Sequence, residues 1–301
     1  MKVKYKNFNC PVCNNKKNIK VYSSNLEKNE IPVIGYDYSD QNQDKTFAYV
    51  ECINCHHVYA SPRVINMYKY YIDKVDHNYI KNSSFRRLTY SKVVNILGKF
   101  KKKGKILEIG SGMGDFIYSA EKKGYNCTGL ELSIYASKFS KQLKQKIFNC
   151  ELKNLSKKIG NKKFDIIVMM GVIEHLEFPL KEINIIKKYL HRGGLVVLWT
   201  GDYDSIYSKI LRKKWWYVIG QHIQLFSRKS LKFLFEKNSF KVIYNRNLPY
   251  VFHYKYLDTH LSRFLIYRFF LRVFCYPIFK LFNILEISLS SEILMILKKK
   301  E

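Results

Sequence analysis

The sequence lacks any hydrophobic run that could cross a membrane and any segment typical of a secretory signal. No uncharged apolar stretch reaches the ~18 residues that a spanning helix needs. The N-terminal stretch MKVKYKNFNC is polar and has no apolar core. We therefore expect a cytoplasmic chain whose cysteine thiols are reduced.

Acidic residues and arginines are also scarce. The chain has 24 Asp and Glu against 53 Lys and Arg, a net charge of +29, and only 10 of the basic residues are Arg. Such a charge favours binding of nucleic acid. Arg, however, binds phosphates in a bidentate way that Lys cannot, and no Arg-rich block is present. This balance disfavours nucleic acid and leaves an anionic small molecule or an anionic membrane as partners. The 301 residues, 47% of them apolar, can bury the core of one large domain with attachments.

The most informative stretch begins with a short apolar run that ends at Ile109. Three glycines follow at alternate positions, Gly110, Gly112 and Gly114, and Glu131 closes a second apolar run. This order predicts a strand, a tight turn, a helix, a strand and an acid, which is half of a doubly wound α/β fold. A dinucleotide-binding motif would have its third glycine at the position of Asp115.

The pattern E-x-G-x-G-x-G from Glu108 to Gly114 instead resembles the first motif of class I S-adenosylmethionine (SAM) methyltransferases. SAM carries a cationic sulfonium and an ammonium, so its site gains from a carboxylate such as Glu108 or Asp115. The resemblance implies that Glu131 accepts hydrogen bonds from the ribose hydroxyls. By family position, the residues expected around SAM are Glu108, Gly110, Gly112, Gly114, Glu131, Leu132, Cys150, Met170 and Gly171.

Three further segments follow in the order expected for this family. They are KFDIIVMM (163–170), GVIEHLEFPLKEI (171–183) and KKYLHRGGLVVLWT (187–200). They are similar to the corresponding run of methyltransferases that act on small molecules, including ubiquinone-pathway and nucleotide-sugar enzymes. The resemblance covers roughly residues 86–240 and implies a seven-stranded Rossmann-like sheet within a SAM-binding domain over 104–301. The final SEILMILKKK resembles the last edge strand of that sheet, which runs antiparallel to its neighbours.

Two C-x-x-C pairs at the N-terminus, Cys10 with Cys13 and Cys52 with Cys55, predict a structural zinc site in a zinc-ribbon-like module over 1–63. A disulfide framework is the alternative, which the absence of a signal segment disfavours. His56 or His57 could replace one cysteine as a ligand. The module is similar to the one that precedes the SAM domain in sugar C-methyltransferases of deoxysugar pathways.

A connector over 64–103 joins this module to the SAM-binding domain. Phe85 to Phe100 has helical spacing in Leu88, Val93, Val94, Leu97 and Phe100. We expect this helix to pack on the sheet ahead of its first strand.

The candidate reaction centre is Glu174-His175, directly after the fourth predicted strand of the sheet, where open α/β sheets bind ligands. An imidazole is a suitable base near neutral pH. In the resembled families this Glu-His pair faces the methyl-transfer centre. His222 lies in a segment, W-x-x-x-x-x-H-x-x-x-F-S, that also resembles those enzymes, with Trp216 as a candidate wall of the acceptor pocket and Ser227 as a helix cap.

Asp202 and Asp204 follow the fifth predicted strand and are candidates to bind acceptor hydroxyls. Towards the C-terminus we predict a helical insertion over 248–290. Within it, residues 263–289 are rich in aromatic and aliphatic side chains, are interrupted by Arg and Lys, and are broken at Pro277. Such a segment suits either a cap over the acceptor pocket or a helix on the inner face of a membrane.

The sequence therefore predicts a SAM-dependent methyltransferase that acts on O or C of a small polar acceptor, a sugar or a sugar-linked metabolite. An RNA methyltransferase is the alternative enzyme, although MGVIEH stands where an N-methylating Asn/Asp-Pro-Pro-aromatic motif would follow the fourth strand. A non-catalytic SAM-binding or zinc scaffold is the alternative outside enzymes.

Overall fold

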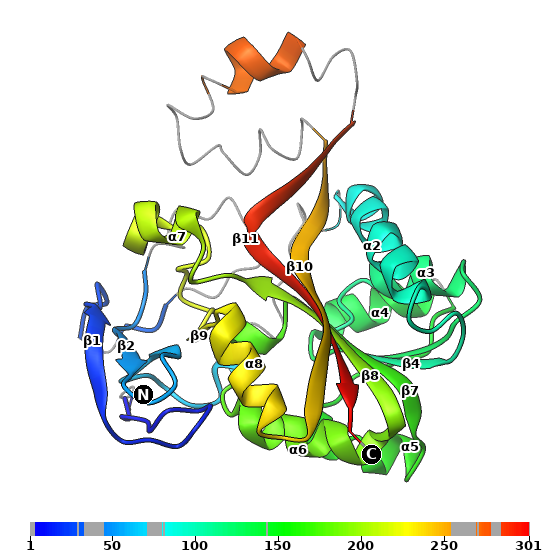
Figure 1. Cartoon of the computed structure of the whole chain (residues 1–301), viewed down its shortest axis with the longest axis horizontal. Coiled ribbons are helices and arrows are strands. Elements are labelled where there is room, and N and C mark those ends of the chain that lie inside the picture. Colours follow the sequence, from blue (N-terminus) through cyan, green and yellow to red (C-terminus); the bar gives the residue numbers. More distant parts are fainter. Residues whose placement is uncertain are drawn as a thin grey trace.

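A mixed sheet of seven strands forms the centre of the computed structural model (Figure 1). The structure describes residues 4–28, 30–32, 45–70, 80, 82–142, 144–253, 269, 271–277 and 284–300. The strand order is β10-β11-β8-β7-β4-β5-β6. The bounds are β4 Lys105–Ile109, β5 Asn126–Leu130, β6 Ile147–Phe148, β7 Phe164–Met170, β8 Leu190–Gly201, β10 Phe240–His253 and β11 Ile284–Lys299.

Strands β4 to β8 are parallel, whereas β11 is antiparallel to both β8 and β10. The apolar run of β7, FDIIVMM, is buried at nearly every position, as expected for a strand with helices on both faces. The predicted seven-stranded Rossmann-like fold is confirmed, and the C-terminal strand is antiparallel as expected. Its predicted place at the edge is wrong, because β11 lies between β8 and β10, and β10 forms the edge.

Helices connect the parallel strands and cover the sheet. They are α3 Asp115–Glu121, α4 Ile134–Gln142, α5 Ser156–Ile159 and α6 Pro179–Tyr189, with the short 3-10 helices η3 Leu152–Asn154 and η4 Ile173–His175. A further helix, α8 Arg228–Glu236, precedes β10. Helix α8 begins at the predicted cap, where Ser227 accepts a hydrogen bond from Ser230 N.

The predicted helix ahead of the sheet is present as α2, Ser83–Gly98. Val93, Val94 and Leu97 are buried in one hydrophobic cluster with residues of β4, β7 and β8. Leu88 and Phe100, which we expected on the same buried face, are exposed instead. The packed face of α2 is therefore narrower than its apolar spacing suggests.

The N-terminal residues form a second sheet of four strands in the order β1-β2-β3-β9. Its first three strands are β1 Asn18–Tyr22, β2 Tyr49–Cys52 and β3 Val58–Ala60, but its fourth, β9 Gln224–Leu225, comes from far along the chain. The predicted module over 1–63 therefore shares its sheet with residues that follow β8. Local sequence patterns could not show this pairing, because the two strands are separated by more than half of the chain.

The predicted helical insertion over 248–290 is wrong at both ends. Strand β10 continues through His253 and β11 begins at Ile284, so the ends of that range are strands that pair with each other. Between them the structure describes residue 269 and residues 271–277, with a π-helix at Leu271–Cys275. The rest of the predicted cap or membrane segment lies outside the described residues.

Among the described residues, no helix combines the length and the apolar character that crossing a membrane requires.

Candidate functional site

The glycine bend, Gly110, Gly112 and Gly114, lies at the carboxyl end of β4. All three glycines have positive φ, at 68°, 51° and 76°. A Cβ on Gly110 would lie 2.6 Å from Val172 Cγ2, and a Cβ on Gly114 would lie 1.8 Å from Gln145 Oε1. The bend therefore needs glycine both for its backbone conformation and for lack of space.

Glu131 contacts this bend. It directly follows β5, and its Oε2 accepts a hydrogen bond of 2.7 Å from Gly112 N. Its Oε1 accepts a hydrogen bond of 2.7 Å from Ser133 N. Burial raises the pKa of this carboxyl, and the backbone N–H groups partly oppose that shift. Each oxygen retains a lone pair, so two adjacent hydroxyls could donate to the same carboxylate.

The two carboxylates considered for the cationic end of SAM have different surroundings. Asp115 is bound by Arg86, with Nη2 at 2.6 Å, by Arg87, with Nε at 2.8 Å, and by the Ser83 hydroxyl. These partners neutralise Asp115 and make it a structural ion pair. Glu108 is buried, and its Oε2 has no hydrogen-bond partner within the described part of the chain.

Burial raises the pKa of Glu108 well above its ordinary value, and the nearby charges of Asp115 and Glu131 add to this shift. The backbone N–H of Ile117 donates to this carboxyl, but a buried carboxylate oxygen such as Oε2, which accepts no hydrogen bond from the described residues, is costly unless a ligand pairs with it. Glu108 is thus the carboxyl that fits a cationic group of the cofactor.

The remaining predicted cofactor residues lie at the same edge of the sheet. Leu132 follows β5, Cys150 follows β6, and Met170 ends β7. Gly171 has a φ of +67° and donates its N–H to Trp199 O at 3.0 Å. The carboxyl ends of parallel strands are where open α/β sheets hold ligands, so this placement agrees with the prediction; the individual roles remain predictions.

Sequence reasoning missed two side chains that shape this edge. The Gln145 side chain donates to Gly114 O at 2.8 Å, and that of Asn149 donates to the carbonyls of Glu131 and Leu132, each at 2.9 Å. Both are polar residues in short connections, so the sequence offered no periodic signal that could have identified them.

His175 and His222 come together although 46 intervening residues separate them. Their ring centroids are 4.8 Å apart, with the rings inclined at 69°. His175 Nδ1 donates to Gln221 O at 3.0 Å, and His222 Nδ1 donates to Tyr217 O at 2.8 Å. Because each Nδ1 carries the proton, each Nε2 presents an unprotonated lone pair.

Burial keeps both imidazoles neutral. It lowers the pKa of His175 to about 4, partly opposed by the Gln221 carbonyl, and it lowers the pKa of His222 well below its usual value, with His175 adding to the shift. Both side chains are nevertheless only partly buried. The pair therefore offers two neutral ring nitrogens near neutral pH.

Glu174, the third predicted catalytic residue, is fully buried beneath the histidines. Its Oε1 accepts a hydrogen bond of 2.9 Å from the hydroxyl of Tyr217, a residue that the sequence reasoning missed. Burial raises its pKa to about 7, and hydrogen bonds from the Tyr217 and Thr200 hydroxyls partly oppose this shift. The Tyr217 ring also lies 4.6 Å from that of His222, so Tyr217 links Glu174 to His222. The aromatic run Trp215-Trp216-Tyr217 could have indicated Tyr217, but the sequence analysis selected Trp216 from it.

Trp216 is half-buried and lies 5.7 Å from the ring of Tyr207. Asp202 is engaged within the protein, since its Oδ2 accepts from Arg228 Nε at 2.8 Å and its Oδ1 from Asp204 N at 3.1 Å. This ion pair argues against the expected binding of acceptor hydroxyls by Asp202. Asp204 is exposed, and its expected role with those hydroxyls stays a prediction.

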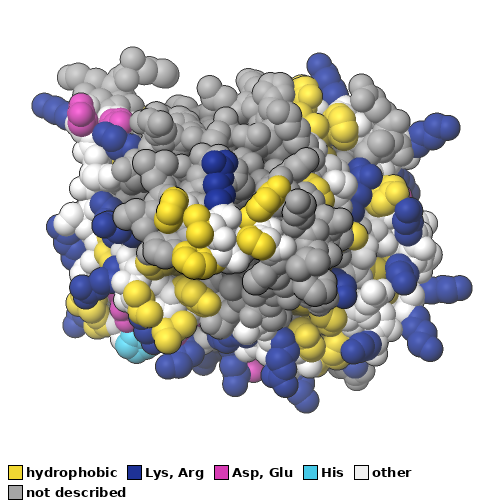
Figure 2. Space-filling model, turned by 90° about the horizontal axis from the view of Figure 1, so that it is seen from above, with side chains coloured by type: hydrophobic (Ala, Val, Ile, Leu, Met, Phe, Trp, Pro, Cys, Tyr) yellow, Lys and Arg dark blue, Asp and Glu magenta, His cyan; other side chains and the backbone are white. Residues whose placement is uncertain are grey.

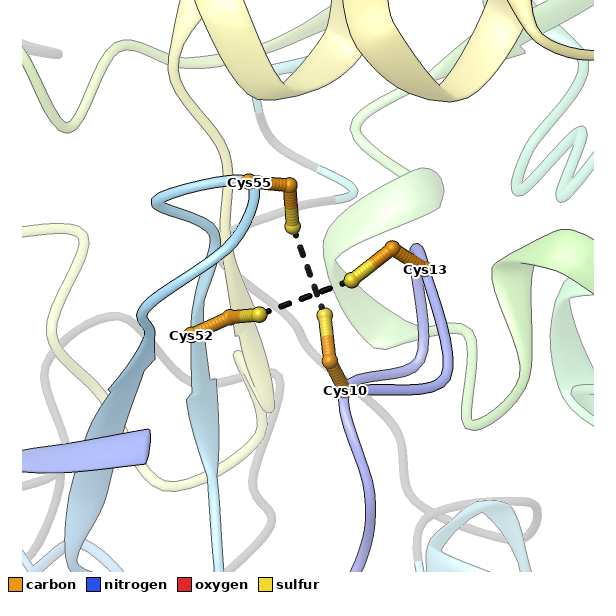
Figure 3. A group of neighbouring side chains, drawn as sticks. All are labelled: Cys10, Cys13, Cys52 and Cys55. Carbon is orange, nitrogen blue, oxygen red and sulfur yellow. Dashed lines mark hydrogen bonds between the residues drawn. The ribbon is translucent and has the colours of Figure 1, made fainter. Parts of the chain in front are cut away.

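The four N-terminal cysteines point toward one another (Figure 3). The Sγ atoms of Cys10 and Cys55 are 3.5 Å apart, as are those of Cys13 and Cys52, and all four lie within 4.8 Å of one another. These cysteines are free thiols, not disulfides. A tetrahedral zinc ion with Zn–S bonds of about 2.3 Å would separate its sulfur ligands by about 3.8 Å, so the cluster fits zinc.

Neither neighbouring histidine belongs to this cluster. His57 is buried and its Nε2 pairs with Gln224 Oε1 at 2.9 Å, while His56 Nδ1 lies 2.8 Å from Glu51 Oε1. The suggestion that one of them replaces a cysteine is therefore not supported.

The cysteine module also contacts the loop that carries His222. Tyr49, on β2, is buried, and its hydroxyl lies 2.7 Å from His222 O and 3.2 Å from Ile219 O. The His57–Gln224 pair and the pairing of β3 with β9 fix the residues that follow. The N-terminal sheet thus supports one side of the candidate reaction centre.

A doubly wound sheet with a glycine bend and a paired acid at its ligand-binding edge defines an α/β enzyme of the nucleotide-binding kind. The family profile of a methyltransferase domain matches residues 82–245, more than half of the chain. The chain therefore belongs to the methyltransferase family, and the predicted class of enzyme is confirmed.

Among curated proteins, the chain is similar to the uncharacterized protein MJ1123 of Methanocaldococcus jannaschii, with 29% identity over 143 residues. This match covers 47% of the chain and 66% of the relative, so the chain spans just under two thirds of that protein.

Solved structures share the fold. A SAM-dependent methyltransferase from Archaeoglobus fulgidus has a TM-score of 0.52 at 21% identity, covering 74% of this chain and all of that one. The YcgJ protein from Bacillus subtilis has a TM-score of 0.51 at 14% identity, covering 71% of this chain and 99% of that one.

Proposed function

We propose that this methyltransferase transfers the methyl group of SAM to an oxygen or carbon of a small polar acceptor, a sugar or a sugar-linked metabolite. The observation that carries the proposal is the contact between Glu131 and the glycine bend, with Gly112 N at 2.7 Å from Oε2. This contact places an acid beside a turn with glycine at alternate positions, where no Cβ of Gly110, Gly112 or Gly114 keeps a ribose from the backbone.

The cofactor residues follow from the same geometry. Glu131 would accept hydrogen bonds from the ribose hydroxyls, and Glu108 would pair with the cationic end. The glycine bend would pass close to the ligand, with Leu132 and Cys150 by the adenine, and with Met170 and Gly171 by the sulfonium. When bound, SAM supplies an electrophilic methyl group.

The two histidines would act on the acceptor. Methyl transfer to a hydroxyl or to a carbon acid needs removal of a proton and alignment of the nucleophile. Each Nε2 lone pair is free to accept that proton, because each Nδ1 is fixed by a backbone carbonyl. Glu174 would hold the Tyr217 hydroxyl and thereby orient the loop that carries His222.

The four cysteines would hold one structural zinc ion. Four thiolates complete a tetrahedral site, so the metal would stabilise the fold without joining the reaction. Its role is to fix the N-terminal sheet, which supports the His222 loop through Tyr49.

A labelled-methyl assay tests the proposal. The purified chain is incubated with methyl-labelled SAM and, in separate reactions, with nucleotide sugars, free sugars or cellular RNA, and products are identified by mass spectrometry. We expect one acceptor class to be labelled, and His175→Ala and His222→Ala to lower kcat by about 10²-fold or more. The exposed His191 provides the control, since His191→Ala should not change kcat. Full activity in both His175→Ala and His222→Ala would exclude these bases, and labelling of RNA but not of sugars would exclude the acceptor class.

A further inference from the structure

Helix α7, Ile206–Leu211, places its apolar side chains on the outside. Ile206 is 62% exposed and Ile210 is 71% exposed, while the residue that α7 buries is Ser208. Ile206 and Ile210 are four positions apart and therefore lie on one face of the helix. An ordinary surface helix buries its apolar face and exposes its polar one, so the inverted pattern of α7 indicates contact with an apolar partner.

A second group of exposed apolar side chains lies on the described residues between β10 and β11. Phe269 is 61% exposed and Phe274 is 62% exposed, and Val273 and Tyr276 are also exposed. In Figure 1 this short helix, drawn in orange, lies at the top of the molecule, and α7 lies lower, at the upper left of the main body. Figure 2 views the molecule from that side and shows apolar side chains gathered on it, with Lys and Arg around them.

The charge of these segments has one sign. Lys209 lies on α7, Arg212-Lys213-Lys214 follow directly, and Arg272 lies among the exposed apolar residues of the second group. Neither residues 205–223 nor residues 269–277 contain an Asp or a Glu. Apart from Asp204, which precedes α7, the charged residues beside these exposed aliphatic and aromatic side chains are basic. Such a surface is complementary to that of a bilayer with anionic lipids.

We propose that this face, defined by α7 with residues 212–214 and by residues 269 and 271–277, docks on an anionic membrane surface. The apolar side chains would enter the boundary between headgroups and acyl chains, and the basic side chains would contact the anionic headgroups. The chain would bind from one side of the bilayer, in keeping with the lack of a membrane-crossing helix among the described residues.

Sedimentation with vesicles tests the proposal on the full-length protein. The vesicles contain phosphatidylcholine alone or phosphatidylcholine with 30% phosphatidylserine. We expect binding to the anionic vesicles that weakens as salt is raised, and little binding to the neutral ones. The double variant Ile206→Ser, Ile210→Ser should lower the affinity about tenfold or more, as should Lys209→Glu, Lys214→Glu. None of these four residues belongs to the candidate site.

Two matched variants serve as controls. Ile19→Ser, Ile65→Ser replaces isoleucines that are also exposed but lie outside this face. Lys157→Glu, Lys158→Glu makes the same change of charge on α5, at the opposite end of the molecule in Figure 1. Both should bind anionic vesicles as the unaltered protein does.

The proposal is overturned if the unaltered protein stays in the supernatant with anionic vesicles, or if the control variants lose as much affinity as the α7 variants. It is also overturned if sedimentation velocity shows a dimer that only Ile206→Ser, Ile210→Ser dissociates, since the face would then bind a second copy of this chain.

Discussion

Removing the hydroxyl of Tyr49 tests whether the N-terminal sheet supports the reaction centre. In Tyr49→Phe the ring remains in the core while the hydrogen bonds to His222 O, at 2.7 Å, and to Ile219 O, at 3.2 Å, are lost. Ile219 O keeps a second donor, His222 N at 3.0 Å. The main consequence is therefore a His222 carbonyl without its donor.

An unsatisfied buried carbonyl costs about 1–3 kcal/mol. The His222 carbonyl is partly buried, so the free energy of unfolding should fall by an amount in the lower part of that range. If about 1.4 kcal/mol of this cost appears as loss of order in the His222 loop, kcat should fall about tenfold. The KM for SAM should not change, because Glu131 and the glycine bend belong to other elements.

Urea unfolding and steady-state kinetics measure the two effects. Tyr59→Phe is the matched control, since Tyr59 is also buried in the N-terminal sheet but donates to Phe8 O, not to the loop. It should lose some stability and keep its kcat. The reasoning is refuted if Tyr49→Phe retains its full kcat, or if Tyr59→Phe lowers kcat equally.

Three further changes probe other parts of the structure. Metal analysis should find about one zinc per chain, and Cys52→Ser should lower both the zinc content and the melting temperature; a metal-free chain of unchanged stability would contradict the zinc site. Burial raises the pKa of Glu292 to about 7 from 4.5, so the folded state binds the proton more tightly than the unfolded state does. The resulting stabilisation of the folded state is complete below pH 4.5 and is lost as the pH rises through 7. The unfolding free energy should fall by about 1 kcal/mol from this group between pH 6 and 8, and Glu292→Gln should flatten that slope in urea titrations; an unchanged slope would mean that Glu292 does not titrate there. Gly114→Ala should weaken SAM binding and destabilise the fold by more than about 1 kcal/mol, because its Cβ meets Gln145, whereas Gly124→Ala has a similar φ of +84° and open space; equal effects of the two substitutions would refute the steric argument.

The predictable parts of the fold and of the site are those that depend on residues close together in the sequence. The glycine bend and Glu131 lie 17 to 21 residues apart, at the ends of strands that pair in parallel, and their contact follows from that topology. The two C-x-x-C pairs likewise each form their own tight turn. In both cases the residue types are restricted by backbone conformation or by ligand chemistry.

The parts that were not predictable depend on distant pairs. The ion pair of Asp115 with Arg86 and Arg87 required the packing of α2 against α3. The bond from Tyr217 to Glu174 required the path of a loop without periodicity. The long pairing of β10 with β11 was missed because its sequence is apolar and aromatic throughout, a composition that does not distinguish a buried helix from a strand.

Calorimetric titration with SAM tests the central claim, that Glu131 and the glycine bend form the cofactor site. The unaltered chain should bind SAM at one site, and Glu131→Ala should weaken binding about 100-fold, the loss of two hydrogen bonds to a charged group. Glu236→Ala removes an exposed carboxylate on α8 and should leave the affinity unchanged. If the unaltered chain does not bind SAM, or if Glu131→Ala binds it equally well, the account is contradicted.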